Sequence, residues 1–443
     1  MAVCRLKKPY INCFRDALEG DPNGLCILHS RENNKDINSF NAAVKEKLAK
    51  EDYEFWEVFF PGPLNFFDGL KFDKPVIFGD AFFVKANFAG VEFNDVDFSG
   101  AFLVEADFRN TTFLGKADFR GAIFKREALF LGTTFQEVDF FDATFEEANF
   151  HGATLQEANF SNSAFEYAIF SFANITERVT FAGVRAGGPS NENHYWEGDL
   201  QFIQFGEKGV IRFVNLSLSQ VEFSGTDLRR MEFDRVIWAS WWGRAAVYDE
   251  VILHQQRWAH LAYVMKHGGL WGRTIPGEEG RLGKPSYAEF APVERLYRQL
   301  KTNYEEERDF KRVGDFHYGE MEMHRRGSFW RQWMPSWYNF YRVLSGYGER
   351  PLRAFIWLLL LIPAWAGLVW WLGIDQTGAQ TPDNYWKTLL FIFEKATLQR
   401  PPWADIQNIN WLGKLLGSLS VLILPGQAAL FILALRNRLG RRR

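Results

Sequence analysis

The chain has 443 residues and a formal net charge of −3, and 47% of its residues are hydrophobic. This length permits two or three domains, and the odd count of three cysteines argues against a closed disulfide framework. The net charge excludes little because it is unevenly placed: residues 78–181 contain 16 Asp and Glu against 7 Lys and Arg, whereas the last eight residues contain five Arg.

All three cysteines fall in residues 1–35, which we interpret as a Cys/His-rich N-terminal knot. They are Cys4, Cys13 and Cys26, and His29 follows Cys26 after two residues. Three thiolates and one imidazole complete a tetrahedral zinc shell, and the short final spacing lets one turn present two ligands to one metal. Four protein ligands leave no open position, so the predicted zinc is structural. The alternative is three unrelated reduced cysteines and a solvated histidine.

Residues 36–50 have apolar side chains at helical spacing, namely Ile37, Phe40, Val44 and Leu48. This spacing predicts a short amphipathic helix. We expect residues 36–60 to cap the repeat region that follows.

An apolar residue, usually phenylalanine, recurs every fifth residue after Phe78, with one-residue slips after Phe113 and Phe124. Small or β-branched residues stand two positions earlier, and polar residues lie between, as in Ala106-Asp107-Phe108. A period of five fits neither a helix nor a flat strand. It indicates a repeat architecture in which each unit buries its apolar face against its neighbours. These central positions are Phe78, Phe83, Phe88, Phe93, Phe98, Leu103, Phe108, Phe113, Phe119, Phe124, Phe130, Phe135, Phe140, Phe145, Phe150, Leu155, Phe160, Phe165 and Phe170.

The pattern resembles the pentapeptide-repeat proteins. The resemblance implies a right-handed quadrilateral β-helix, in which the central residue and the preceding small residue point inward and four pentads form one coil. Counting from Phe66 to Phe181 gives 23 pentads, or roughly six coils and a rod about 25–30 Å long at about 4.8 Å per coil. A second run from Phe213 to Trp238 adds six pentads. The predicted fold is therefore mainly β, followed by helices.

We predict that the β-helix occupies residues 61–265, with a loop near 182–199. Residues 241–267 have no clear pattern, but four aromatic residues there are expected to close the end of the rod: Trp241, Trp242, Trp258 and Tyr263.

The Gly- and Pro-rich residues 266–292 are expected to form a linker, and residues 293–350 a cytoplasmic helical connector. We expect a first helix from Val293 to Gly314 and a second from Phe316 to Arg326, forming a solvated hairpin. This connector resembles a linker of membrane-attached bacterial pentapeptide-repeat proteins.

Residues 351–443 are predicted to form a two-span membrane hairpin. Residues 354–372 and 415–435 are free of charge, and each segment reaches the roughly 20 residues that cross a bilayer core of about 30 Å. Arginines flank both spans on the sides that join the rod and the C-terminus. By the positive-inside rule, the N-terminal bulk and the C-terminus face the cytoplasm. The expected location is a bacterial inner membrane.

Residues 384–403, between the spans, contain an apolar stretch too short to cross a membrane, which predicts a re-entrant or interfacial helix. The order of span, short helix, loop and span resembles two-span cation channels, although the carbonyl filter of potassium channels has no counterpart here. The pore-loop candidates are Glu394, Lys395, Thr397, Gln399 and Arg400. The alternative is a plain anchor with a membrane-surface helix between the spans.

The sequence contains no common catalytic motif, and we predict a non-enzyme. We expect an oligomeric, channel-like membrane protein with a regulatory repeat module. The alternative is a membrane-anchored interaction scaffold with no conduction. Expected partners are the lipid bilayer, further copies of the chain and a protein on the β-helix surface. The carboxylates of the repeats are ordinary solvated side chains in this interpretation, so nucleic-acid binding is not expected.

Overall fold

The computed structural model describes residues 3–8, 11–32, 35–62, 66–67, 69–186, 196–266, 289–333, 337–372, 382–396 and 411–440. It divides into two compact units, Met1–Pro285 and Ser286–Arg443.

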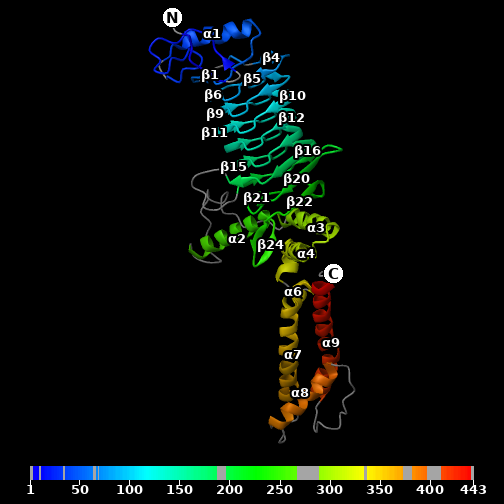
Figure 1. Cartoon of the computed structure of the whole chain (residues 1–443). Helices are drawn as coiled ribbons and strands as arrows, with labels where there is room; N and C mark the ends of the chain where they lie inside the picture. The colour runs from blue at the N-terminus through cyan, green and yellow to red at the C-terminus, as the bar shows by residue number, and fades with distance from the viewer. Residues whose placement is uncertain are drawn as a thin grey trace. The chain divides into compact units, whose positions relative to one another are not determined.

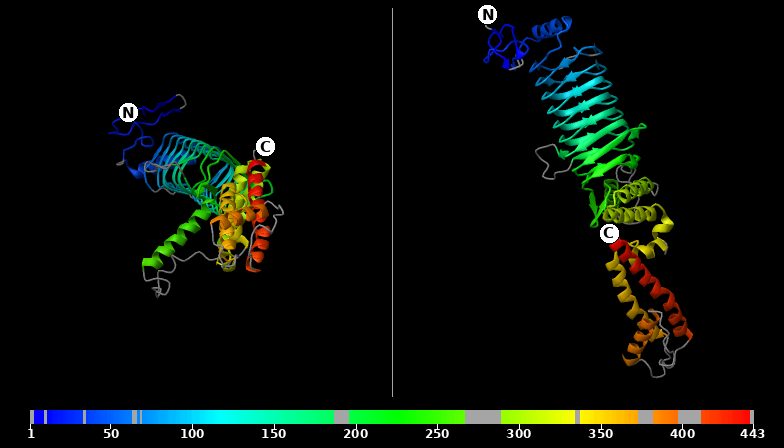
Figure 2. Two further views of the ribbon diagram at one scale, coloured as in Figure 1. Left: turned by 90° about the horizontal axis from the view of Figure 1, so that it is seen from below. Right: turned by 45° about the vertical axis from the view of Figure 1, so that its right-hand side comes forward.

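Most of the first unit is a parallel β-solenoid, which confirms the predicted fold (Figure 1). Its described strands stack into two columns and make about eight turns (Figure 2). One column contains β4 (Lys71–Phe72), β7 (Glu92–Phe93), β10 (Thr112–Asp118), β12 (Thr134–Asp139), β14 (Thr154–Asn159), β16 (Asn174–Ala182), β20 (Val210–Val214) and β22 (Met231–Asp234). The other contains β3 (Phe59–Phe60), β6 (Phe82–Val84), β9 (Phe102–Asp107), β11 (Ile123–Leu129), β13 (Thr144–Asn149), β15 (Ala164–Ile169), β18 (Glu197–Asp199) and β21 (Val221–Glu222).

Short strands complete some of the turns. They are β5 (Val76–Ile77), β8 (Val96–Asp97), β17 (Arg185–Ala186) and β19 (Gln204–Phe205), with a 3₁₀ turn at Leu228–Arg230. Strands on successive turns are in register, so that Phe145 pairs with Phe165. The chain therefore gains about one turn for every 20 residues.

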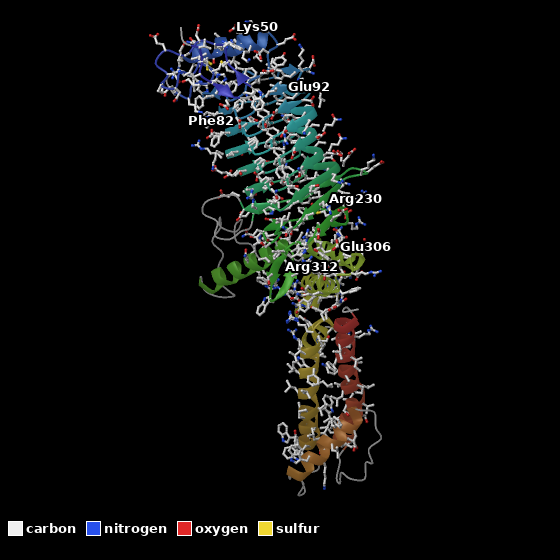
Figure 3. The ribbon with its side chains drawn as sticks, viewed as in Figure 1. Lys50, Phe82, Glu92, Arg230, Glu306 and Arg312 are labelled. Atoms are coloured by element: carbon white, nitrogen blue, oxygen red, sulfur yellow. The ribbon has the colours of Figure 1, made fainter. Side chains whose placement is uncertain are left out.

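The interior of the solenoid consists of stacked aromatic rings. Phe98, Phe119 and Phe140 form part of one column with ring centroids 4.9 Å apart, and Phe108 and Phe130 stack at 5.0 Å in another. These side chains are fully buried, as are nearly all of the small residues two positions before them. Side chains fill the coils in Figure 3, whereas Glu92 lies at the outer surface. The five-residue period therefore marks the inward positions, as predicted.

The polar residues between the central positions build the corners. The Asp107 and Asp139 carboxylates accept hydrogen bonds from the backbone N–H two residues on, each at 3.0 Å. Two residues after the central phenylalanine the backbone enters the left-handed region, for example at Gly100 (φ +65°) and Asn110 (φ +56°). Glycine and asparagine tolerate this conformation best. Many of the acidic residues are thus turn formers.

The one-residue slips in the period correspond to β-bulges. The pairing of β10 with β12 shifts between Phe113 and Lys116, and that of β11 with β13 shifts between Phe124 and Glu127. A bulge accommodates one extra residue on one strand without changing the inward face on either side of it.

Helix α1 (Ile37–Ala49) covers the first coil. Asp36 caps it by accepting a hydrogen bond from the Ser39 N–H at 2.9 Å, and its buried Phe40 ring contacts Phe60 edge-on at 5.7 Å. The first strand of the column, β3, begins at Phe59, so the solenoid starts slightly before the predicted residue 61.

The far end of the solenoid differs from the prediction of a β-helix over 61–265. The coils end near Asp234, and an antiparallel hairpin of β23 (Ala239–Trp241) and β24 (Arg244–Ala246) leads into helix α2 (Tyr248–Lys266). The buried Asp249 carboxylate accepts hydrogen bonds from the Phe223 N–H and the Ser224 hydroxyl. The open strand edge thus receives a partner from a helix rather than from another coil.

Two further expectations concern the loop near 182–199 and the aromatic residues at the end of the rod. Inside the expected loop near 182–199, the described residues form β17 and β18 at either side. Trp241 stacks on His254 at 4.5 Å near the end of the rod, whereas the Trp258 and Tyr263 side chains lie outside the described residues.

The second unit is helical. Its described helices are α3 (Phe290–Glu306), α4 (Phe310–Arg326), α5 (Phe329–Trp333), α6 (Trp337–Ser345), α7 (Pro351–Leu372), α8 (Pro382–Ala396) and α9 (Trp411–Gly440). Helix α3 begins at Phe290 and not at residue 293. The predicted break at Gly314 is wrong, because the helix ends at Glu306 and Asp309 caps α4 by accepting from the Arg312 N–H.

We predict that Phe140→Asp unfolds the adjacent coils, because it removes a fully buried ring and leaves an unpaired charge inside. The expected loss in unfolding free energy is at least about 3–5 kcal/mol. Glu147→Gln, on the exposed face of β13, should change it by less than about 0.5 kcal/mol. Denaturant unfolding of both variants checks this, and equal tolerance would contradict the assigned inward face.

A second prediction concerns pH. Burial, with the negative charges of Asp249 and Asp199, raises the pKa of Glu222 from 4.5 to about 7. Because the folded carboxyl holds its proton more tightly than the unfolded one, its stabilising contribution is present below pH 4.5 and is lost as pH rises through 7. Glu222→Gln should therefore raise the thermal midpoint at pH 8 and change it little at pH 4. Glu137→Gln, an exposed carboxyl on β12, should show no such difference.

Candidate functional site

The predicted zinc ligands lie together in the structure. One ligand atom from each of Cys4, Cys13, Cys26 and His29 lies within 4.8 Å of all the others. The Cys13 and Cys26 sulfurs are 3.6 Å apart, and the Cys4 sulfur is 3.8 Å from Nδ1 of His29. A tetrahedral zinc with ordinary Zn–S and Zn–N bonds requires edges of about 3.5–3.8 Å. The Cys26–His29 edge, at 3.1 Å, is somewhat shorter.

The local backbone explains how distant ligands converge. The N–H groups of His29 and Ser30 donate to the Cys26 carbonyl at 3.1 and 2.8 Å, so one tight turn presents Cys26 and His29 on the same side. The Cys4 N–H donates to the Arg15 carbonyl, which brings the segment around Cys4 beside the segment around Arg15. Cys4, Cys26 and His29 are buried. The hydrogen bond with Cys13, together with burial, raises the pKa of the Cys26 thiol to about 11.

The knot is joined to the first coil through its backbone. The Phe59 N–H donates to the Leu28 carbonyl at 3.0 Å, next to the ligand turn. Lys35 is buried, and its ammonium donates to the carbonyls of Ile27, Ser30 and Phe59. Desolvation lowers the pKa of Lys35 to about 8. The Cys/His cluster and strand β3 therefore share hydrogen bonds, so a loss of structure in one of them loosens the other.

Helices α7 and α9 are long and apolar enough to cross a membrane. Only 11% of the most apolar stretch of α7 and 22% of that of α9 is buried. Large apolar side chains such as Leu359, Leu422 and Ile432 are more than half exposed. A core helix of a soluble protein would bury such residues.

Helix α8 packs against both long helices within the same unit. Its Phe391 and Ile392 join a buried apolar cluster with Val369 of α7 and Leu424 of α9. The indole N–H of Trp365 donates to the Leu416 carbonyl at 3.0 Å and links α7 to α9. The short apolar segment between the predicted spans is thus a helix held in the hairpin.

The structure describes the pore-loop candidates only in part. Glu394 lies near the end of α8, where its side chain is partly exposed, and Lys395 belongs to the same helix. Thr397, Gln399 and Arg400 lie outside the described residues. The structure therefore leaves their proposed convergence untested.

A buried charge cluster in the connector was not anticipated from the sequence. Glu322 of α4 is 5% exposed and accepts from Arg325 and Arg326 at 2.7 Å and from the Tyr347 hydroxyl at 3.1 Å. Arg342 lies 3.6 Å from the same carboxylate. Burial alone would raise the pKa of Glu322, but these arginines lower it to about 2. Residues 293–350 are therefore more than a solvated hairpin.

Tyr347 reaches Glu322 from a strained loop between α6 and α7. Gly346, Tyr347 and Gly348 all have positive φ values, of 58°, 60° and 77°, and such a value is unusual for tyrosine. The loop and the start of α7 also receive hydrogen bonds from α9: the Asn437 amide donates to the Gly348 carbonyl at 3.2 Å and the buried Gln427 amide to the Ala354 carbonyl at 2.9 Å. This loop joins the connector to both long helices.

The surface of the solenoid carries an exposed aromatic column. Phe172 and Phe202 occupy corner positions with φ values of 59° and 54°, where other coils have glycine, asparagine or aspartate. Each side chain is 46% exposed, and the rings stack at 5.0 Å. His151 extends the column, 5.3 Å from Phe172. Their sequence signal is an aromatic residue two positions after Phe170 and Leu200.

Comparisons with known proteins agree with the solenoid. Two family models described as pentapeptide repeats match the chain, one of nine copies at residues 102–144 and one of eight copies at residues 78–110 and 143–177. A comparison with curated proteins gives no match.

Two solved structures illustrate the likeness. QnrB1, a plasmid-mediated fluoroquinolone resistance protein, is 20% identical and has a TM-score of 0.24, with coverage of 38% of this chain and 77% of its own. HetL, a pentapeptide repeat protein from the cyanobacterium Nostoc involved in heterocyst differentiation regulation, is 13% identical and has a TM-score of 0.19, with coverage of 44% and 93%. Scores this low support no argument about function.

The repeat matches fall on the coils whose central phenylalanines form the stacked interior. Residues 78–177 are therefore pentapeptide repeats, and the β-solenoid that contains them is followed by a helical region with two long apolar helices.

Proposed function

We propose that this protein is an integral membrane protein, in which α7 and α9 span the bilayer as a hairpin. The observation that carries this proposal is the exposed apolar surface of both helices, which water would solvate poorly. The arginine-rich flanks support an orientation with the solenoid and the C-terminus in the cytoplasm of a bacterium, at the inner membrane. No catalytic role is proposed, since the sequence has no common catalytic motif.

The hairpin is proposed to form an ion pathway by association of several chains. Its support is α8, a short helix packed on both long helices through Phe391 and Ile392. A two-helix hairpin cannot enclose a pore alone, so conduction requires a homo-oligomer, which we propose to be a tetramer on the model of two-span channels. In this proposed arrangement residues 397–400, which lie outside the described residues, are nearest the axis. The solenoid acts as the regulatory module.

A structural zinc ion is proposed for the N-terminal knot. Three sulfurs and one imidazole nitrogen within 4.8 Å of one another are the donor set that zinc prefers. The ion would hold Cys4 and Cys13 against the Cys26–His29 turn and so fix the Leu28 carbonyl beneath Phe59. Its role is to secure the N-terminal cap.

The competing function is a membrane-anchored scaffold that conducts no ions. The exposed aromatic column of His151, Phe172 and Phe202 favours it. Bulky residues in the left-handed region cost about 1–2 kcal/mol each relative to glycine, and both rings remain 46% exposed, so the column offers an apolar surface to a partner. A protein partner on this face of the solenoid is the corresponding proposal.

For the channel, we predict that Glu394→Lys shifts the reversal potential in a salt gradient toward the equilibrium potential of the anion. The reason is that a ring of charge sets the sign of the permeating ion. The measurement is a planar-bilayer recording of the reconstituted full chain. Glu306→Lys, an equal change at an exposed site of α3, is the control and should leave the potential unchanged. A protein that is monomeric in detergent and passes no current would contradict the channel, and the anchored scaffold would be the remaining proposal.

For the metal, we predict about one zinc per chain by elemental analysis of the purified protein. His29→Ala should lose the ion and raise amide exchange in α1 and at Phe59 by about tenfold or more, since metal binding contributes directly to folding of the knot. His151→Ala removes a histidine from the solenoid surface and should keep both zinc and protection. A metal-free protein with three titratable thiols and an unchanged cap would refute the proposal.

A further inference from the structure

The first two turns of α7 line a cavity of about 390 Å³. Its wall includes the two guanidinium-bearing side chains of Arg350 and Arg353, the carboxylate-bearing Glu349, and the apolar Ile356 and Trp357. The lining of the cavity therefore combines cationic and apolar side chains.

The two arginines of this cavity lack carboxylate partners among the described residues. Arg353 donates to the backbone carbonyl of Arg342 at 3.3 Å, and Arg350 lies over the Tyr318 ring at 5.3 Å. The arginines of the neighbouring cluster differ in this respect, because Arg325, Arg326 and Arg342 all lie within 4 Å of the Glu322 carboxylate. Glu349 has an interaction of its own. The formal charge of the cavity lining, two arginines against one glutamate, is thus positive by one.

The position of the cavity on α7 narrows the choice of occupant. Charged residues stop at Arg353, and the uncharged stretch begins at Ala354. Leu352 and Ile356 are 67% and 46% exposed around the cavity. In a spanning helix this is the level of the lipid headgroups, where tryptophan is also enriched. Arginine binds phosphate oxygens through paired N–H groups.

We propose that this cavity binds the phosphate headgroup of an anionic phospholipid, with Arg350 and Arg353 as its ligands and the acyl chains along Leu352 and Ile356. An occupant with one net negative charge neutralises the lining, whereas a zwitterionic lipid leaves a positive charge. The inference rests on the proposed membrane-spanning function of α7. It makes the entry of the first helix into the bilayer a site of lipid selection.

The test uses the full chain in neutral detergent, incubated with equal amounts of phosphatidylglycerol and phosphatidylcholine and examined by native mass spectrometry. Phosphatidylglycerol should be retained about tenfold or more over phosphatidylcholine, at about one molecule per chain. The Arg350→Gln/Arg353→Gln variant should lose this preference. The Arg178→Gln/Arg295→Gln variant, with the same change of net charge at exposed sites of the solenoid and α3, should retain it.

Three outcomes overturn the inference. They are equal retention of the two lipids, an unchanged preference in the cavity variant, and displacement of the lipid by inorganic phosphate at equal concentration. Insertion into vesicles that resists extraction is measured on the same preparations. It distinguishes failure of the lipid-binding cavity from failure of the membrane-spanning function. Insertion without lipid preference refutes the cavity alone, and failure to insert refutes the membrane function together with it.

Discussion

Ring stacking between successive coils is the constraint on which the solenoid depends. One coil of about 20 residues has only a single layer of core. Its central phenylalanines contact one another edge-on, and they stack face to face on the rings of the coils before and after. The columns through Phe98, Phe119 and Phe140 keep spacings of about 4.9 Å, close to the distance between hydrogen-bonded strands. Backbone pairing and aromatic packing therefore share one repeat distance. The corners, formed by aspartate side chains that accept backbone hydrogen bonds and by left-handed glycines, turn the chain at intervals that preserve this repeat distance.

This local rule explains why so much of the fold can be predicted from sequence. The spacing alone predicts that Phe108 and Phe140 point inward. The slips after Phe113 and Phe124 correspond to bulges. The cysteine cluster was similarly predictable, because three thiols and a nearby histidine form a complete ligand set. In both cases the chemistry of the residue types restricts the possible arrangements.

The features that escaped prediction depend on partners far away in the sequence. Glu322, Arg325 and Arg326 have the spacing of an ordinary solvated helix face. Glu322 and Arg325 are nevertheless buried, and Glu322 accepts a hydrogen bond from Tyr347, which comes from a loop 25 residues later. Helix α2 ends the solenoid because Asp249 reaches Phe223, and no periodicity signals that contact. The helix break before Asp309 is formed by Arg308 in the left-handed region and by the capping hydrogen bond of Asp309, neither of which the sequence pattern signals as strongly as Gly314 five residues later.

The two ends of the solenoid are closed by different chemistry. At one end, the backbone of the Cys/His knot continues the strand ladder through Leu28 and Phe59. At the other, a buried carboxylate of α2 terminates it beside the protonatable Glu222. Because each coil contacts only its neighbours, one end of the solenoid can fray while the other end stays folded. The rod thus has two independent stops. The proposed zinc would make one of them depend on metal, the buried Glu222 makes the other depend on pH, and the stack between them transmits the loss of either stop only one coil at a time.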